Sequence, residues 1–418
     1  MYKNITGCRA CSSTDLTEVL AFGDMPLSDG FLTEEQLKQP EHRFPLTVVF
    51  CGDCSLVQIR ETVDPEILFG ADYPYFSSFS DAWLRHCRDN ALELIDARKL
   101  GPGSQVVEIA ANDGYLLRNY AERGIPVLGV DPAPGPVAAA RKSGIPMREA
   151  FFGREYAESL VAEGIRADVI HGNNVLAHVA DLQGIVDGIR ILLKDDGMAV
   201  IEAPYVRDLI DHCEFDTIYH EHLCYFSVTA VSRLFASRGL TLVDVRRLPT
   251  HGGSLRMFIQ RTGTPSAAVV QLLAEEKGLG LDRAGYYRDF AARVESVKTS
   301  LQQLLGSLKA EGKRIAGYAA AAKATILLNA AGVDGRYLDY VVDRNVHKHG
   351  KYIPGVRLPI YDTTKLLEAP APDYVVVLAW NLKDEIIRQQ QAFADRGGQF
   401  IVPVPAPRIV PSTSPVAV

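Results

Sequence analysis

The sequence predicts an α/β protein with a small cysteine-rich N-terminal module and two lobes in which strands alternate with helices. Three observations lead to this expectation. Two Cys-x2-Cys pairs lie near the N-terminus, at residues 8–11 and 51–54. Short apolar runs alternate with helix-length segments between residues 105 and 202, and a second alternation of the same kind runs from 314 to 402. Strands that alternate with helices are typical of open, mostly parallel sheets.

The composition is that of a globular protein with a mild negative charge. The 418 residues are 47% hydrophobic and 23% charged, which excludes a disordered or collagen-like chain. The 44 Lys and Arg residues against 51 Asp and Glu residues give a net charge of −7, so the basic footprint of a nucleic-acid-binding protein is missing. Residues 1–8 lack the apolar core of a signal peptide, and no apolar run reaches the roughly 18 residues of a membrane-spanning helix. We therefore expect a cytoplasmic protein that binds neither nucleic acid nor membrane, and a monomer because no coiled-coil pattern demands a dimer.

The paired cysteines predict a structural zinc site. Seven cysteines is an odd number, which argues against a closed disulfide framework. Four thiolates in two Cys-x2-Cys pairs, with no open coordination position, are typical of structural zinc. A redox pair or two disulfides are the alternatives. The predicted ligands are Cys8, Cys11, Cys51 and Cys54, whereas the isolated Cys87, Cys213 and Cys224 are interpreted as small apolar residues.

We expect five segments along the chain. Apolar side chains between Tyr287 and Leu308 recur every three or four residues, which predicts a long amphipathic helix that Gly312 ends. This helix joins the two lobes. The expected segments are a zinc-binding domain (1–70), a first α/β domain (71–265), linking helices (266–312), a second α/β domain (313–405) and a tail (406–418).

The strands and the first helix are placed by the buried β-branched runs and by the pattern of apolar residues. A helix is expected at 81–98. The strands of the first lobe are expected at 105–109, 127–130, 167–171 and 198–202, and those of the second lobe at 314–318, 340–342, 374–378 and 400–402.

The turn after the first of these strands predicts a cofactor site. It holds a single glycine in place of the GxGxxG that seats a dinucleotide pyrophosphate. An acid at the strand end can meet the cationic groups of S-adenosylmethionine, and an acid that ends the next strand can accept ribose hydroxyls, a role shared with NAD folds. The pattern favours S-adenosylmethionine over NAD or a degenerate sheet. The candidates are Glu108, Asn112, Asp113, Gly114, Asp131 and, past the third strand, Asn174, whose alternative role is a helix cap.

Reactive side chains cluster between Tyr219 and His222. His220 and His222 form a possible metal pair, but residues 223–227 supply no further acid. General-base chemistry fits better, because histidine titrates near neutral pH and Glu221 can set its tautomer. Two further histidines are candidates for the same cleft: His178, whose alternative is a core histidine, and His251, which precedes two glycines.

The second lobe repeats the strand, small-residue turn and helix. Lys323 at the helix start, with backbone N–H groups, can hold a diphosphate. Asp343 ends the next strand, as a ribose-binding acid would. The alternative is a vestigial nucleotide fold with Lys323 on the surface.

Taken in order, these motifs cover nearly the whole chain and resemble one family. They are Cys8, Cys11, Cys51 and Cys54; Tyr73-Pro74-Tyr75; Asn112-Asp113-Gly114; Tyr219 with Glu221-His222; His251-Gly252-Gly253; and Gly317-Tyr318 through Lys323. The chain resembles the nucleotide-sugar C-methyltransferases that make branched deoxysugars, among them the C-3 methyltransferase of the tetronitrose pathway. The resemblance implies a zinc-binding N-terminal domain, a class I methyltransferase Rossmann-like domain and a C-terminal Rossmann-like domain that helps to hold the nucleotide sugar.

The resemblance also implies roles for single residues. His222 matches the family's base, Tyr219 and Glu221 match residues that assist it, and His178 matches a further active-site histidine. The candidates for substrate binding are Tyr73, Tyr75, Ser77, Ser80, His251 and Lys323. Two departures matter. Relatives usually have Gly at the position of Ala110 and often at that of Ala319, and His220 stands where the tetronitrose-pathway enzyme has an acid.

The expected activity is transfer of a methyl group from S-adenosylmethionine to the carbon next to the ketone of a nucleoside-diphosphate 4-keto-deoxysugar. We expect dTDP as the nucleotide and C-3 as the carbon, although C-5 is equally adjacent to a C-4 ketone. Two alternatives stay open. One is an NAD-dependent nucleotide-sugar oxidoreductase, and the other is a catalytically inactive, zinc-stabilised binding protein.

Overall fold

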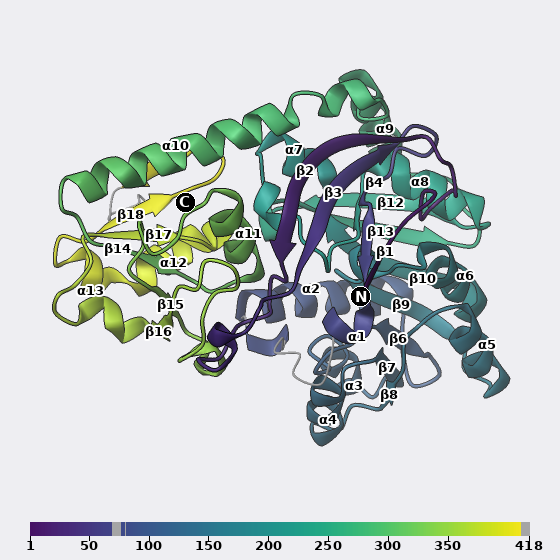
Figure 1. Ribbon diagram of the computed structural model, residues 1–418. Helices are drawn as coiled ribbons and strands as arrows, with labels where there is room; N and C mark the ends of the chain where they lie inside the picture. The colour runs from purple at the N-terminus through teal and green to yellow at the C-terminus, as the bar shows by residue number, and fades with distance from the viewer. Residues whose placement is uncertain (69–76, 80, 411–418) are drawn as a thin grey trace.

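The computed structural model describes residues 1–68, 77–79 and 81–410. It contains an N-terminal module, a larger α/β domain and a smaller C-terminal α/β domain (Figure 1). The long helix α10 (Phe290–Ala310) runs along one side of the molecule and connects the two α/β domains, as the apolar spacing predicts. No helix among these residues is long and apolar enough to span a membrane.

The N-terminal module shares a sheet with the first α/β domain. Its strands β2 (Leu16–Pro26), β3 (Arg43–Cys51) and β4 (Val57–Ile59) pair antiparallel, and β4 also pairs with β11 (Cys224–Tyr225). Since β11 comes directly after the reactive cluster, the module holds that cluster in place. The module's other elements are β1 (Tyr2–Asn4), which pairs with β5 (Glu61–Val63), the 3-10 helix η1 (Gln36–Lys38) and α1 (Pro65–Leu68).

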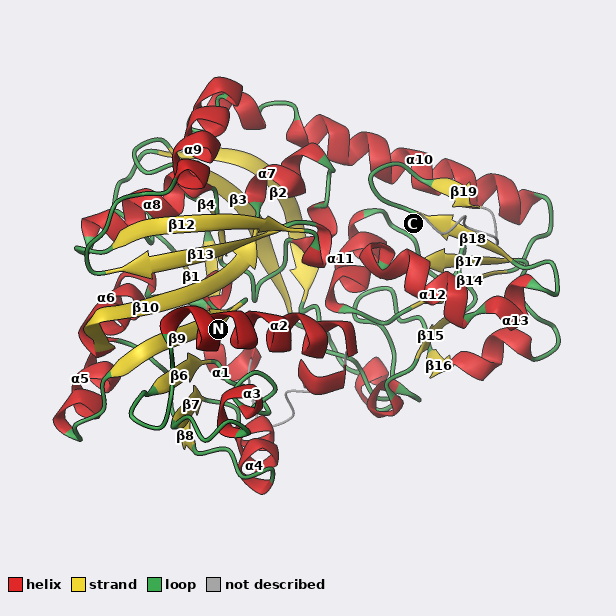
Figure 2. Cartoon of the chain, turned by 180° about the vertical axis from the view of Figure 1, so that it is seen from behind, coloured by secondary structure: helices red, strands yellow, loops and turns green. Residues whose placement is uncertain are grey.

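The first α/β domain is built on a seven-stranded sheet whose strand order is β12-β13-β10-β9-β6-β7-β8 (Figure 2). The strands are β6 (Val106–Ile109), β7 (Val127–Asp131), β8 (Met147–Glu149), β9 (Ala167–Asn173), β10 (Leu193–Pro204), β12 (Thr241–Leu248) and β13 (Ser254–Gln260). All are parallel to their neighbours except at β13, which is antiparallel to both β10 and β12. The order reverses between β6 and β9, so their carboxyl ends border the crevice where such sheets bind ligands.

Helices cover both faces of this sheet. The α-helices are α2 (Asp81–Arg98), α3 (Arg118–Ala121), α4 (Pro134–Lys142), α5 (Arg154–Ala162), α6 (Leu182–Leu192), α7 (Val206–Asp211) and α8 (Val228–Ser237), and the 3-10 helices are η2 (Ser77–Phe79), η3 (Leu176–His178), η4 (Phe215–Thr217) and η5 (Thr250–Gly252). Figure 2 shows α2 lying across the face of the sheet. Its bounds coincide with the expected helix at 81–98.

The C-terminal domain has the strand order of a dinucleotide-binding fold. Its sheet reads β16-β15-β14-β17-β18-β19, which is 3-2-1-4-5-6 in chain order. The strands are β14 (Ile315–Tyr318), β15 (Val341–Asp343), β16 (Ile360–Asp362), β17 (Tyr374–Val377), β18 (Gln399–Val402) and the antiparallel β19 (Arg408–Val410). The helices are α11 (Ala322–Ala330), η7 (Val346–Lys348), η8 (Thr363–Leu367), η9 (Trp380–Leu382), α12 (Lys383–Gln389) and α13 (Gln391–Ala394). Helix α9 (Ala267–Leu279), η6 (Ala284–Tyr287) and α10 lie within the segment expected to link the domains.

The predicted α/β class is confirmed, and the eight expected strands differ from the observed ones mainly at their ends. The largest differences are that β10 begins at Leu193 and that β9 continues to Asn173, two residues beyond the expected end. The longer β9 affects the cofactor site, because it includes Asn173 in the strand.

The loop between β2 and β3 extends from the N-terminal module to the C-terminal domain (Figure 1). Leu32 forms a bridge with Tyr352, and the Thr325 hydroxyl donates a 2.8 Å hydrogen bond to the Ser28 carbonyl. The backbone N–H of Gly355 donates to the Glu41 carboxylate. The module therefore contacts both α/β domains.

Candidate active site

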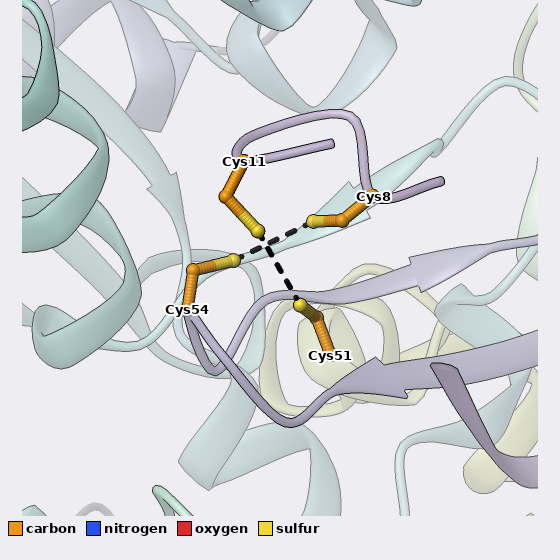
Figure 3. A group of neighbouring side chains, drawn as sticks. All are labelled: Cys8, Cys11, Cys51 and Cys54. Atoms are coloured by element: carbon orange, nitrogen blue, oxygen red, sulfur yellow. Dashed lines mark hydrogen bonds between the residues drawn. The ribbon is translucent and has the colours of Figure 1, made fainter. Parts of the chain in front are cut away.

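The four predicted metal ligands converge. The sulfur atoms of Cys8, Cys11, Cys51 and Cys54 all lie within 4.8 Å of one another. Figure 3 shows the four side chains pointing toward a common centre, with 3.5 Å between Cys8 and Cys54 and 3.6 Å between Cys11 and Cys51. Four sulfurs bound at about 2.3 Å to a tetrahedral zinc ion lie roughly 3.8 Å apart, so the cluster fits zinc. It is the one metal-type cluster among the residues that the structure describes.

Polar groups behind the cysteines stabilise their charge. The Gln58 amide donates a 3.1 Å hydrogen bond to the Cys8 sulfur, and its carbonyl accepts from the backbone N–H of Arg9. Gln58 and Arg9 are both buried, and the Arg9 guanidinium also binds the carbonyls of Ile59 and Glu61. Hydrogen bonds of this kind orient ligands and moderate their charge at metal sites.

The cofactor turn has a left-handed backbone. Ala110 has φ +56° and Asn112 has φ +49°, values that L-residues other than Asn and Asp seldom adopt. Two backbone N–H groups bind the Asp131 carboxylate: those of Asn112 at 2.9 Å and Ala133 at 2.8 Å. Asp131 thus holds the turn, as an acid that ends the adjacent strand can.

Carboxyl groups crowd this turn. Glu108 is completely buried, and burial together with the charges of Asp131 and Asp113 holds the pKa of its carboxyl well above the usual range. Burial also raises the pKa of Asp131. A cation bound among these three carboxyls would favour their ionised forms and so offset the cost of burying them. S-adenosylmethionine, with its sulfonium and ammonium, fits this donor set.

Two neighbouring segments complete the turn. The backbone N–H of Ser77 donates to the Asn112 side chain at 2.9 Å, and Ser78 donates to the Asp113 carboxylate. The free oxygen of Asp113 is buried without a hydrogen-bond partner, which suits a ligand donor. The predicted substrate residue Ser77 therefore lies on the predicted cofactor turn.

At the end of β9 the neighbour of the predicted asparagine has the better placed side chain. Asn174 has φ +54°, and its backbone N–H is bound to the Glu202 carbonyl. Asn173 is buried, donates to the Tyr115 hydroxyl at 3.4 Å and has a side-chain oxygen without a partner. The alternation of side chains along β9 puts Asn173 on the same face as His171, a signal that a strand ending at 171 conceals.

The reactive cluster surrounds the His222 imidazole. Its Nδ1 donates a 2.9 Å hydrogen bond to the Thr217 carbonyl, so the neutral ring carries its proton on Nδ1 and its lone pair on Nε2. The Tyr219 ring packs on it at 3.9 Å between centroids, and the His178 ring meets it edge-on at 4.8 Å. The structure therefore brings Tyr219, His178 and His222 together, and the backbone carbonyl of Glu221 accepts a hydrogen bond from the His178 ring.

Burial tunes the groups around His222. Burial lowers the pKa of His178 to about 4, so that imidazole is neutral at pH 7. Burial, reinforced by the charge of Asp29 from the β2–β3 loop, holds the pKa of Glu221 well above its usual range. A neutral Glu221 can donate a hydrogen bond. Sequence reasoning missed Asp29, which faces this cluster from a distant segment.

His220 has a different environment from His222. It is completely buried, its Nε2 donates to the Pro45 carbonyl at 3.1 Å, and its ring lies edge-on to Phe44. Burial lowers its pKa. Both partners belong to β3, so His220 packs the reactive segment against the N-terminal module, and no described acid completes a metal site with His222.

Lys323 lies in the interface between the two α/β domains. Its Nζ donates to the Asn381 side chain at 2.9 Å and lies 4.4 Å from the centre of the Trp380 ring. The charges of Asp216 and Glu214 favour its protonated form, while burial lowers the pKa of Lys323. Sequence reasoning missed these two acids and Trp380.

Glu214 also approaches the glycines that follow His251. A Cβ on Gly252 would lie 2.5 Å from a Glu214 carboxylate oxygen, and the φ of Gly252 is +94°, so both space and backbone favour glycine there. The predicted positions 251 and 323 thus border one acid. Tyr73, Tyr75 and Ser80 lie outside the described residues, as does the side chain of His251.

Three family models match the chain. The "Putative zinc binding domain" covers residues 8–69, the "Methyltransferase domain" residues 82–245 and the "C-methyltransferase C-terminal domain" residues 249–405. The first includes all four clustered cysteines.

The chain is also similar to individual known methyltransferases. The C-methyltransferase NovU of Streptomyces niveus is 36% identical over 417 residues, which cover 98% of each chain. A ubiquinone biosynthesis O-methyltransferase of Methylobacterium sp. (strain 4-46) is 33% identical over 116 residues, 26% of this chain and 45% of that protein. The solved magnesium protoporphyrin IX methyltransferase of Synechocystis PCC 6803 matches 43% of this chain and 83% of its own at 15% identity, with a TM-score of 0.35.

Proposed function

This chain belongs to the C-methyltransferase family and is an S-adenosylmethionine-dependent enzyme, and from that premise we propose that it methylates a nucleotide-linked 4-keto-deoxysugar. The acceptor is the carbon next to the ketone, C-3 of a dTDP sugar, and the product is a branched sugar. The enzyme acts as a cytoplasmic monomer, and the cysteine cluster holds a structural zinc ion.

The single observation that carries this proposal is the hydrogen bond from His222 Nδ1 to the Thr217 carbonyl. It leaves the basic lone pair on Nε2, which takes the proton from the carbon next to the ketone. The electron pair of that C–H bond passes into an enolate whose oxygen is the former ketone oxygen. The enolate carbon then takes the methyl group, so that the new C–C bond would form as the C–S bond of the methyl donor breaks and its electron pair stays on the sulfur. A histidine suits this step because its pKa lies near the working pH.

Glu221 and Tyr219 stabilise the enolate. A protonated Glu221 can donate a hydrogen bond to the developing oxyanion, and burial, reinforced by the charge of Asp29, raises its pKa and so favours the protonated form. Tyr219, packed on the His222 ring, fixes the plane of the imidazole. His178 is the further active-site histidine, and its lowered pKa suits it to contact the sugar as a neutral group.

The methyl donor binds at the turn after β6. When bound, S-adenosylmethionine supplies the methyl group that the deprotonated carbon accepts. Asp131 would accept from the ribose hydroxyls, and the residues that would hold the cationic part are Glu108, Asn112, Asp113 and Gly114, with Asn173 or Asn174 at the end of β9. The turn itself argues against the NAD-dependent alternative, because it has a single glycine in place of the GxGxxG that seats a dinucleotide pyrophosphate.

The nucleotide sugar lies between the two α/β domains and the β2–β3 loop. We assign its contacts to Tyr73, Tyr75, Ser77, Ser80, His251 and Lys323. A diphosphate at Lys323 shares that cation with Asp216 and Glu214, so its binding strengthens as those acids take up protons.

The test is a substrate panel with isotopically labelled S-adenosylmethionine. We expect transfer to dTDP-4-keto-6-deoxysugars, with the new carbon at C-3 by NMR, and none to the 4-hydroxy sugars, which have no acidified C–H. Transfer to an oxygen, or equal transfer to the 4-hydroxy sugars, contradicts the proposal. Calorimetric titration with NAD and with S-adenosylmethionine separates the oxidoreductase and the inactive alternatives.

A further inference from the structure

Trp380 crosses the interface between the two α/β domains. It begins η9, separated from the end of β17 by Leu378 and Ala379, and its indole Nε1 donates a 2.7 Å hydrogen bond to a carboxylate oxygen of Asp216 in η4. Asp216 is completely buried, at 0% exposure. An N–H to carboxylate hydrogen bond of this length in a buried interface fixes both partners.

This contact lies at the edge of the C-terminal sheet where folds of this kind bind their ligands. The strand order of that domain reverses between β14 and β17, and ligands of such folds bind beyond the carboxyl ends of those strands. Trp380 and Asn381 follow β17 there, and Lys323 begins the helix after β14. The partner that meets this edge is η4 of the other domain, against which α11 packs.

Lys323 reinforces the contact. Its ammonium lies over the Trp380 ring and is held by Asn381. Its charge favours the ionised form of Asp216, against the burial that raises the pKa of that carboxyl to about 6. The titratable groups that interact with Asp216 are Lys323 from α11 and Glu214, the residue before η4.

The segment that Trp380 holds also carries the partner of His222. Thr217 follows Asp216 in the same short 3-10 helix, and its carbonyl accepts the hydrogen bond from His222 Nδ1. Its hydroxyl and its N–H both bind the Glu214 carbonyl, so η4 moves as one rigid turn. A rotation of Asp216 would therefore turn the Thr217 carbonyl away from the imidazole.

We propose that Trp380 and Asp216 are positioning residues for His222, through which the C-terminal domain sets the tautomer and orientation of the base. The proposal rests on the proposed function in one respect, that His222 is the base. Trp380 does not touch the reacting atoms. Its effect passes through η4.

The experiment compares the full-length protein with Trp380→Phe, which keeps an aromatic ring but removes the N–H. We expect kcat to fall about tenfold with the KM for the sugar unchanged. Without a firm carbonyl acceptor the imidazolium is less stabilised, so the acidic limb of the kcat pH profile moves to lower pH. In protein with 15N-labelled histidine, the NMR signals of His222 show a larger share of the Nε2–H tautomer.

Two further variants keep the result interpretable. Asp216→Asn retains an oxygen that accepts from the indole and is expected to preserve the tautomer, whereas Asp216→Ala behaves like Trp380→Phe. Tyr340→Phe is the matched control, because it removes one hydrogen bond of the C-terminal domain, to the Lys365 carbonyl, far from η4. It is expected to change neither the kinetics nor the His222 signals. Thermal melting checks that each variant is folded.

Three outcomes overturn the inference. They are wild-type behaviour of Trp380→Phe, a rise in the KM for the sugar alone, and lost activity with an unchanged His222 tautomer and pH limb. Failure of the proposed function appears differently, as full activity of His222→Asn. The NMR comparison does not depend on activity and tests the positioning role in either case.

Discussion

Asp131 and Asp343 hold the same position in two different sheets. Each ends the second strand of its domain and accepts one hydrogen bond from the turn after the first strand and one from the residue two positions ahead. The donors are the N–H groups of Asn112 and Ala133 for Asp131, at 2.9 and 2.8 Å, and of Ala320 and Asn345 for Asp343, both at 2.7 Å. A carboxylate has about four lone-pair sites, so each can still accept from ribose hydroxyls.

The first prediction separates these two acids. Asp131→Ala removes an acceptor for the ribose hydroxyls, and we expect the affinity for S-adenosylmethionine to fall by about 1–3 kcal/mol, the range of a lost hydrogen bond to a charged group. Isothermal calorimetry measures it. Asp343→Ala is the matched control and is expected to leave that affinity unchanged. Unchanged binding by Asp131→Ala would remove this residue from the cofactor site.

The second prediction concerns Ala110, which has a left-handed backbone in the cofactor turn. Ala110 has φ +56°, a conformation that is about 1–2 kcal/mol unfavourable for an L-residue, whereas glycine loses about 0.5–1 kcal/mol in backbone entropy. Ala110→Gly should therefore stabilise the protein by roughly 0.5–1 kcal/mol. Urea unfolding measures this. Ala111→Gly, at a completely buried neighbour without a positive φ, should destabilise it, and equal effects of the two changes would contradict the strain argument.

The sequence predicts best those parts of the site that lie within a short run of residues. The spacing within each cysteine pair predicts a metal cluster because two residues between ligands suit one ion. Asp131 is predictable because it ends a buried run. Asn173 was missed for a local reason. The strand expected at 167–171 ended two residues before the observed end of β9, so the sequence did not show that the side chain of Asn173 lies on the same face as that of His171.

The remaining parts depend on contacts between distant segments. The partners of Asp216 and Glu221 come from the C-terminal domain and from the β2–β3 loop, and no periodicity within a segment indicates which loop meets which. The separate role of His220 likewise depends on β3, which lies far away in the sequence.

The third prediction tests the cysteine cluster. We expect about one zinc per purified chain, and Cys54→Ser should lose the metal together with much of the stability, because binding energy in such sites is folding energy. Metal analysis and thermal melting measure the two effects. Cys213→Ser changes a buried cysteine outside the cluster and should keep its zinc. A metal-free protein of full stability would contradict the assignment.

The fourth prediction follows from the raised pKa of Glu214. Burial raises the pKa of this carboxyl to about 8, so between pH 4.5 and 8 the folded state holds a proton that the unfolded chain has released. The contribution of this group to the free energy of unfolding therefore falls as pH rises through that window, by about 1.4 kcal/mol per pH unit. Glutamine cannot release the proton. Glu214→Gln should thus gain stability relative to the parent from pH 5 to pH 8, and parallel curves in urea unfolding would contradict the shift.

The last prediction concerns the base. Deprotonation of a carbon next to a ketone needs a group whose pKa lies near the working pH, and His222 presents the lone pair of Nε2 because Thr217 holds Nδ1–H. His222→Asn should lower both methyl transfer and exchange of the sugar's α-proton with deuterated water by about 100-fold or more, the size usual for a positioned acid–base group. Binding of S-adenosylmethionine should persist, since the cofactor turn lies on β6 and β7.

A His222→Asn protein that loses methyl transfer but keeps proton exchange would show that another residue is the base. The candidate is then His178, whose ring lies 4.8 Å from that of His222. Because burial lowers the pKa of His178 to about 4, such an enzyme would keep its activity at pH values where a base of ordinary pKa is already protonated, and the pH profile therefore distinguishes the two histidines.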